Sequence, residues 1–125
     1  MSLLLDTHAL LWWLADDAEL GADARSAIGT AEAEVYVSSV SIWEIAIKRK
    51  LGKLDAPDDL LAELDRQRFV ALPLTAREAW MAGHLDLHHT DPFDRALVAQ
   101  ALVQGLRVVT RDPGIAAYGV DVMTT

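Results

Sequence analysis

The sequence contains no cysteine, and this absence excludes several kinds of chemistry at once. Without thiols the chain can form neither disulfides nor zinc–thiolate sites, and it has no thiol nucleophile. Internal repeats and low-complexity tracts are also absent. The chain has 125 residues, 52% of them hydrophobic and 24% charged, which is typical of one compact domain. We therefore expect residues 1–125 to form a single domain, and the lack of thiols fits a reducing compartment.

Positive charge is scarce in this chain. It has 11 Lys and Arg residues against 19 Asp and Glu residues, so its formal net charge at pH 7 is −8. Proteins that bind nucleic acid by bulk electrostatics neutralise phosphates with Lys and Arg, which argues against that mode here. The charge is still compatible with a protein that meets phosphate through bound cations, because a metal ion inverts the local field.

No hydrophobic run is long enough to cross a membrane. The largely apolar stretch from Met1 to Ala15 is interrupted by Asp6 and His8 and lacks the basic start of a signal peptide. This stretch predicts a strand followed by a helix, and we expect a cytoplasmic protein that makes no membrane contact.

Three consecutive leucines, Leu3 to Leu5, predict a short strand that is buried on both faces. Asp6 follows directly, and an ionised carboxylate is costly to bury unless it is paired. In a parallel α/β sheet such a group lies in the crevice outside the carboxyl ends of the strands, where these folds hold their ligands. The alternative is that Asp6 or Thr7 only caps the following helix.

Strands and helices alternate along the rest of the chain. Hydrophobic patterns predict further strands at 35–37, 69–72, 106–110 and 120–123, and helices at 9–15, 22–31, 40–51, 58–66, 76–82, 92–105 and 115–117. This alternation is typical of an α/β domain with a mostly parallel sheet and helices on both faces.

Glu44 is the second candidate acid, and it lies on an apolar helical stripe. It shares that helix face with Val40, Ile47 and Leu51 and so does not face solvent. The alternative is a capping box that starts at Ser41, in which the Glu44 side chain bonds back to the Ser41 amide.

Two further acids have comparable settings. Asp91 and Pro92 predict a helix start, with Asp91 as the N-cap. Asp94 lies near the third helical position, where the helix dipole and the free amides favour an anion. We take Asp91 as the cap and Asp94 as the ligand. Asp112 directly follows the strand predicted at 106–110.

Four carboxylates that converge repel one another unless a cation neutralises them. Oxygen ligands suit a hard ion such as Mg²⁺ or Mn²⁺. One or two such ions can activate water and stabilise the leaving oxygen in the in-line hydrolysis of a phosphodiester. We therefore predict a catalytic metal site at four acids, which we call the quartet: Asp6, Glu44, Asp94 and Asp112.

Histidines and basic residues are further candidates beside the quartet. His84, His88 and His89 suggest a metal site, but a histidine pair before a helix is more typical of a loop. Lys48, Arg49, Lys50 and Lys53 form the basic cluster of this acidic chain. Basic helix ends usually complement the macrodipole, and in this context the cluster is also a candidate phosphate contact.

Four stretches resemble the PIN-domain ribonucleases, and within them the toxins of VapBC-type toxin–antitoxin pairs. The stretches follow the family's order and spacing from end to end, and they are residues 4–12, 38–45, 91–101 and 109–112. The resemblance implies a PIN-like three-layer fold with a mostly parallel five-stranded sheet, and a magnesium-dependent endoribonuclease. It carries the acidic site onto the quartet, in which Asp112 is the position that varies most across the family.

The resemblance also implies supporting residues and partners. Thr110 would steady the site by hydrogen bonding, and Thr7, Asp91 and Arg95 stand beside quartet residues in the matching motifs. Such toxins act on transfer or ribosomal RNA in the bacterial cytoplasm, which makes the basic cluster a candidate RNA contact.

Toxins of this family form homodimers and bind a small VapB-type antitoxin. The antitoxin's C-terminal segment blocks the acidic groove, often with a basic side chain, which agrees with the net negative charge of this chain. Trp43 and Trp80 offer apolar surface for such a contact, although we expect both to be buried in the core.

Three alternatives compete with this interpretation. A phosphatase-type phosphotransfer domain would need a second Asp two residues after Asp6, where His8 stands, and a receiver domain would need an acidic pair at the first strand. A catalytically silent PIN-like module would bind RNA or a protein without cutting. In a merely structural domain, every acid of the quartet would be a helix cap.

Overall fold

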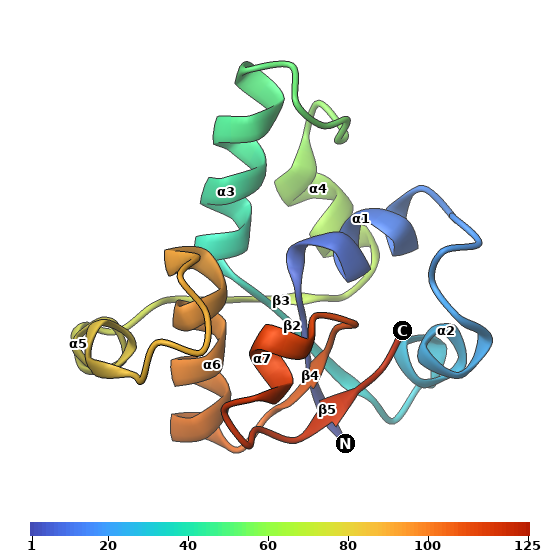
Figure 1. The fold of residues 1–125 in the computed structure, drawn as a ribbon. Helices are drawn as coiled ribbons and strands as arrows, with labels where there is room; N and C mark the ends of the chain where they lie inside the picture. Colours follow the sequence, from blue (N-terminus) through green and yellow to red (C-terminus); the bar gives the residue numbers. More distant parts are fainter.

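The three leucines form the core of β1 (Ser2–Leu5), the central strand of the sheet. The computed structural model describes all residues from 1 to 125. The other strands are β2 (Glu34–Ser38), β3 (Val70–Leu72), β4 (Arg107–Val109) and β5 (Val122–Met123). Their order is β3-β2-β1-β4-β5 (Figure 1), and every neighbouring pair is parallel. The expected five-stranded sheet is confirmed.

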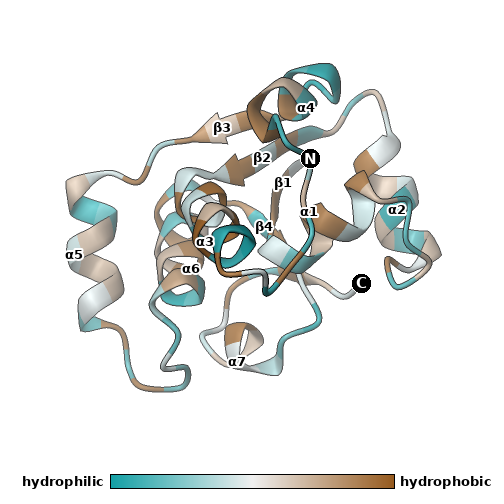
Figure 2. Cartoon of the chain, turned by 90° about the horizontal axis from the view of Figure 1, so that it is seen from above, coloured by the Kyte–Doolittle hydropathy of each residue, from teal (hydrophilic) through white to brown (hydrophobic).

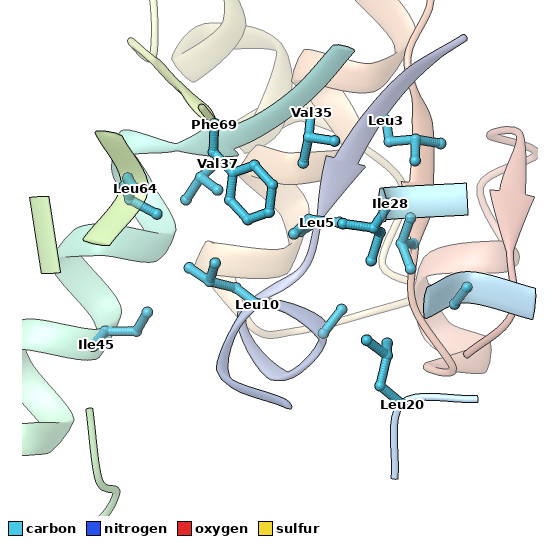
Figure 3. Close-up of a cluster of buried hydrophobic side chains, with 13 residues drawn as sticks. Leu3, Leu5, Leu10, Leu20, Ile28, Val35, Val37, Ile45, Leu64 and Phe69 are labelled. Atoms are coloured by element: carbon cyan, nitrogen blue, oxygen red, sulfur yellow. The ribbon is translucent and has the colours of Figure 1, made fainter. Parts of the chain in front are cut away.

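Alternate residues of β1 enter two separate cores. Leu3 and Leu5 belong to a cluster that also contains Val37, Leu10 and Ile28 (Figure 3), and Leu4 belongs to a second cluster on the opposite face. All three leucines are fully buried. A strand covered on both faces needs apolar residues at every position, which explains the unbroken leucine run.

The chain forms seven helices: α1 (Thr7–Leu14), α2 (Ala22–Gly29), α3 (Ser39–Lys50), α4 (Leu60–Arg66), α5 (Ala76–His84), α6 (Pro92–Gln104) and α7 (Pro113–Ala116). The cluster around Leu3 is completed by α1, α2, α3 and α4, and the cluster around Leu4 by α6 and α7. Figure 2 shows strands β1 and β2 between α1 and α2 on one side and α6 on the other. The expected three-layer α/β fold is confirmed. None of these helices combines the length and apolar character that a bilayer crossing requires.

Capping residues set several helix starts differently from the hydrophobic pattern. The helix expected at residue 9 begins at Thr7, because the Asp6 side chain accepts a hydrogen bond from the Ala9 amide. The helix expected at residue 58 begins at Leu60, because Asp59 is its N-cap. Hydrophobic periodicity locates a helix, but the side chain that satisfies its free amides decides where it starts.

Trp43 and Trp80 are not buried, so the expectation that they belong to the core is wrong. Their exposed fractions are 62% and 74%. On α3 the inward positions are held by smaller residues, including Val40 and Ile45, which leaves Trp43 to pack edge-on against Phe93. Periodicity shows that a helix has an apolar face, but tertiary packing decides which side of it is covered.

The strand order reverses at β1, and this reversal positions the site. The chain builds β2 and β3 on one side of β1 and then returns to build β4 and β5 on the other. In parallel α/β sheets, the crevice outside the carboxyl ends of the strands at such a reversal is the usual ligand site. Asp6 directly follows β1, and Thr110 and Asp112 follow β4.

We predict that Leu4→Ala lowers the free energy of unfolding by about 3 kcal/mol, because it leaves a cavity in a core that is closed on all sides. Leu87→Ala is the matched control, since Leu87 is 80% exposed, and we expect a change within about 0.5 kcal/mol. Urea denaturation measures both values. Equal effects of the two substitutions would contradict the assigned burial.

Candidate active site

The quartet acids line one cavity of about 480 Å³, outside the carboxyl ends of β1 and β4. We call this cavity the acidic cleft. Its walls are formed by Asp6, Thr7, His8, Trp12, Glu44, Lys48, His89, Asp91, Asp94, Arg111 and Asp112. The structure therefore brings together the whole quartet, with Thr7 and Asp91 from the supporting set.

Asp6 is both a helix cap and a wall of the cleft. Its Oδ1 atom accepts a hydrogen bond of 2.8 Å from the Ala9 amide. Burial raises the pKa of Asp6 above its ordinary value, and the hydrogen bond from the Thr110 side chain offsets only part of that effect. The two roles that the sequence presented as alternatives are combined in one side chain.

Glu44 is buried and held from two sides. Thr7 donates its hydroxyl to Oε1 at 2.5 Å, and Lys48 donates from Nζ to Oε2 at 2.6 Å. The N-cap of α3 is Ser38, whose Oγ accepts from the Val40 amide at 3.1 Å. Glu44 lies well inside the helix, so the capping-box alternative for this acid is wrong.

Asp91 and Asp94 lie at the start of α6. The Asp91 side chain accepts a hydrogen bond of 2.8 Å from the Phe93 amide, which confirms the expected N-cap. Burial, reinforced by the negative charge of Asp91, raises the pKa of Asp94 to about 7. Asp94 therefore holds a proton for about half the time at neutral pH unless a cation takes the proton's place.

Asp112 follows β4 and caps the short helix α7. Its Oδ1 accepts from the Gly114 amide at 2.8 Å, and its own amide donates to Thr110 Oγ1 at 3.0 Å. Burial would raise the pKa of Asp112, but the hydrogen bonds from His89 and Gly114 outweigh it and lower the pKa. The Thr110 side chain also bonds to Asp6, so one threonine contacts two quartet acids.

The structure places His89 in the cleft, whereas the sequence favours only a loop position for it. Its Nε2 atom lies 2.8 Å from Asp112 Oδ2 and 3.0 Å from Asp94 Oδ2. The hydrogen bond to Asp112 raises the pKa of the imidazole. By contrast, His84 lies against Trp80 and His88 against Tyr118. The one sequence signal for His89 is its place two residues before the cap of α6.

Arg95 is buried and lies outside the cleft wall. Its guanidinium donates to the backbone carbonyls of five residues: Ala82, Gly83, Leu85, Asp86 and His89. The distance is 2.8 Å to the Leu85 oxygen and 3.1 Å to the His89 oxygen. Arg95 thereby fixes the loop between α5 and α6. The supporting role expected for it is exerted on the backbone and not on a quartet carboxylate.

The basic cluster does not act as one surface. Lys48 reaches the cleft, whereas Arg49 pairs with Asp58, and Lys50 and Lys53 are exposed beyond the cleft. A cation that sequence reasoning missed is Arg111, which lines the cleft with its guanidinium 4.4 Å from the centre of the Trp12 ring. Arg111 also pairs with Glu19 at 2.8 Å.

The donor set of the cleft fits a hard divalent cation. Five carboxyl groups line it, against the two permanent cations Lys48 and Arg111, which already pair with Glu44 and Glu19. Burial raises the pKa values of Asp6 and Asp94, so a cation in the cleft would favour their ionised forms. Oxygen donors in such a setting suit Mg²⁺ or Mn²⁺.

The chain matches the family model of the PIN domain over residues 3–120. It is 30% identical over 114 residues to Ribonuclease VapC22 of Mycobacterium tuberculosis (strain ATCC 25618 / H37Rv), an alignment that spans 89% of this chain and 87% of that protein.

Solved structures share the fold. A chain of VapBC2 from Rickettsia felis, bound to a DNA fragment from its promoter, superposes with a TM-score of 0.72 at 13% identity, covering 99% of this chain and 98% of that one. A chain of DNA-bound VapBC from Salmonella typhimurium gives a TM-score of 0.68 at 19% identity, with the same coverage of 99% and 98%.

The raised pKa of Asp94 predicts that the metal-free protein loses stability as the pH rises toward 7. Between the ordinary pKa of 3.8 and the folded-state pKa of about 7, the folded protein holds a proton that the unfolded chain has released. Asn cannot ionise, so at pH 8 we expect Asp94→Asn to raise the free energy of unfolding by about 2 kcal/mol. Urea denaturation in EDTA at pH 5 and pH 8 tests this. The same pH dependence in both proteins would be inconsistent with the assigned pKa.

Proposed function

Because this chain belongs to the PIN-domain family, and within it to the VapC group, we propose that it is a divalent-metal-dependent endoribonuclease and the toxin of a VapBC-type toxin–antitoxin pair. The proposal rests on one observation, which is that all four quartet acids line the acidic cleft. Repelling carboxylates lower the stability of the folded state, so a module without catalytic function would gain nothing from them.

The quartet would hold the ion, which we assign as Mg²⁺ with Mn²⁺ as the alternative. When bound, such an ion activates water and stabilises the leaving oxygen of a phosphodiester. Thr7 and Lys48 fix both oxygens of Glu44. Thr110 fixes Asp6 and Asp112 relative to each other. Asp94 would have to be ionised to hold the ion, so we expect tighter ion binding at higher pH.

RNA would approach the cleft past two lysines that we call the RNA-binding rim. Lys50, the last residue of α3, and Lys53, just after that helix, are exposed beyond the cleft and would bind phosphates. The substrate class that the family implies is folded transfer or ribosomal RNA. Lys48 is bound to Glu44, so we assign it to the site itself and not to the RNA-binding rim.

The proposed protein partner is a VapB-type antitoxin. An acidic cleft suits a cationic inhibitor, and a basic side chain placed there would pair with the carboxylates that have no cation of their own. The named VapBC structures that share this fold support such a pairing. We also propose a homodimer, as the family implies.

RNA cleavage tests the proposal. We expect the purified, antitoxin-free protein to cut cellular RNA into discrete fragments with Mg²⁺ and not with EDTA. Asp94→Asn should lower the rate by at least about 100-fold, because it removes a ligand of the ion. Asp65→Asn, an exposed Asp on α4, is the matched control and should cut normally. A folded protein that cuts no RNA with any divalent ion would instead be a binding module.

A salt titration tests the RNA-binding rim. Replacing both Lys50 and Lys53 by Ala should weaken RNA binding and reduce the slope of log affinity against log salt by about 0.7 for each lost phosphate contact. Arg77→Ala, at an exposed position on α5, should change neither. Fluorescence anisotropy in EDTA measures binding without cleavage. An unchanged slope in the double variant would show that RNA enters elsewhere.

A further inference from the structure

His89 occupies a place in the acidic cleft for which the proposed quartet gives no role. Its Nε2 atom lies between two quartet carboxylates, 2.8 Å from Asp112 Oδ2 and 3.0 Å from Asp94 Oδ2. The ligand atoms of these three residues all lie within 4.8 Å of one another, a spacing that would also suit three ligands of one ion. The hydrogen bonds around the imidazole ring distinguish the two roles.

The other ring nitrogen of His89 is an acceptor. The Asp91 amide donates to Nδ1 at 3.0 Å, so the lone pair of Nδ1 is engaged and the ring hydrogen lies on Nε2. With its hydrogen on Nε2, the ring donates to the carboxylates from that atom and has no lone pair there to offer a metal ion.

Three groups hold His89 in this position. Tyr118 accepts a hydrogen bond from the His89 amide at 3.0 Å, and Arg95 donates to the His89 carbonyl at 3.1 Å. Gly114 leaves room for the ring, since a Cβ atom at that position would lie only 2.6 Å from His89 Cδ2. The contacts come from α6, α7 and the turn after α7, and together they set both the backbone and the ring.

We propose that His89 is a positioning residue whose Nε2–H ties Asp94 to Asp112 and sets their spacing for a divalent ion, without ligating that ion. The inference rests on the proposed function in one respect, because it takes these two acids as part of the ion site. Partners that orient metal-binding side chains typically change metal affinity about 10–100-fold when they are replaced.

Two substitutions of His89 separate its ring nitrogens. Gln places an N–H donor near the position of Nε2, whereas Asn places an acceptor near that of Nδ1 and leaves no donor between the carboxylates. We expect His89→Asn to weaken Mn²⁺ binding by about tenfold or more, and His89→Gln to stay within about threefold of the unchanged protein. Calorimetric titration measures both affinities, and circular dichroism checks that each variant is folded. Equal affinity in all three proteins, or equal loss in both variants, would overturn the proposal.

Gly114→Ala tests the same point without altering His89. The added methyl group would lie 2.6 Å from His89 Cδ2 and 3.1 Å from Asp112 Oδ1, so the closer contact is with the imidazole ring, and we expect Mn²⁺ affinity to fall as predicted for His89→Asn. Gly83→Ala is the matched control, because Gly83 is also helical and a Cβ atom there meets nothing within 4 Å. Normal affinity in a folded Gly114→Ala protein would contradict the positioning role.

The protonation of Nε2 can be observed directly. We expect long-range ¹H–¹⁵N spectra of the unaltered protein to show a protonated Nε2 both without and with saturating Mg²⁺. Loss of that proton on Mg²⁺ binding would make His89 a ligand and overturn the proposal. These measurements need no RNA, so failure of RNA cleavage alone would refute the proposed nuclease and leave the role of His89 to be decided by ion binding.

Discussion

The site depends on holding several carboxyl groups together against their mutual repulsion. Five of them line the acidic cleft, and two, Asp6 and Asp94, have pKa values raised mainly by burial. The free energy for this arrangement comes from the apolar core, where β1 is buried on both faces. Strands β1 and β4 are neighbours in the sheet and run parallel, so the acids that follow their carboxyl ends come close together in spite of their repulsion.

Hydrogen bonds at helix N-termini offset part of the repulsion between these carboxylates. Asp6, Asp91 and Asp112 are the N-caps of α1, α6 and α7, and each binds a backbone amide with one carboxylate oxygen. The amides and dipoles at these helix starts supply partial positive charge, and in Asp112 the second oxygen faces His89 in the cleft. Capping and ligand binding therefore reinforce each other, and the sequence motifs that signal a helix start also mark the site.

The sequence predicts the parts of this arrangement that depend on local pattern. The buried leucine run, the alternation of strands and helices, and the caps at Asp91 and Asp6 all follow from nearby residues. Periodicity locates Glu44, and Lys48 lies four residues further along the same helix, but the bond from Thr7 to Glu44 requires the packing of α1 against α3. His89 could not be placed, because its position depends on Arg95, Tyr118 and Gly114, which lie 6 to 29 residues away in sequence. Trp43 and Trp80 show that apolar residues on a helix can remain outside the core when smaller residues fill the inward face.

The central claim is that the acidic cleft binds a divalent ion through its carboxylates. Anomalous diffraction from crystals soaked in Mn²⁺ tests it most directly, because manganese scatters anomalously and the signal locates the ion without assumptions about its ligands. We predict a peak in the cleft within coordination distance of the quartet carboxylates. A cleft that stays without a peak at saturating Mn²⁺, or an ion bound only elsewhere, would contradict it.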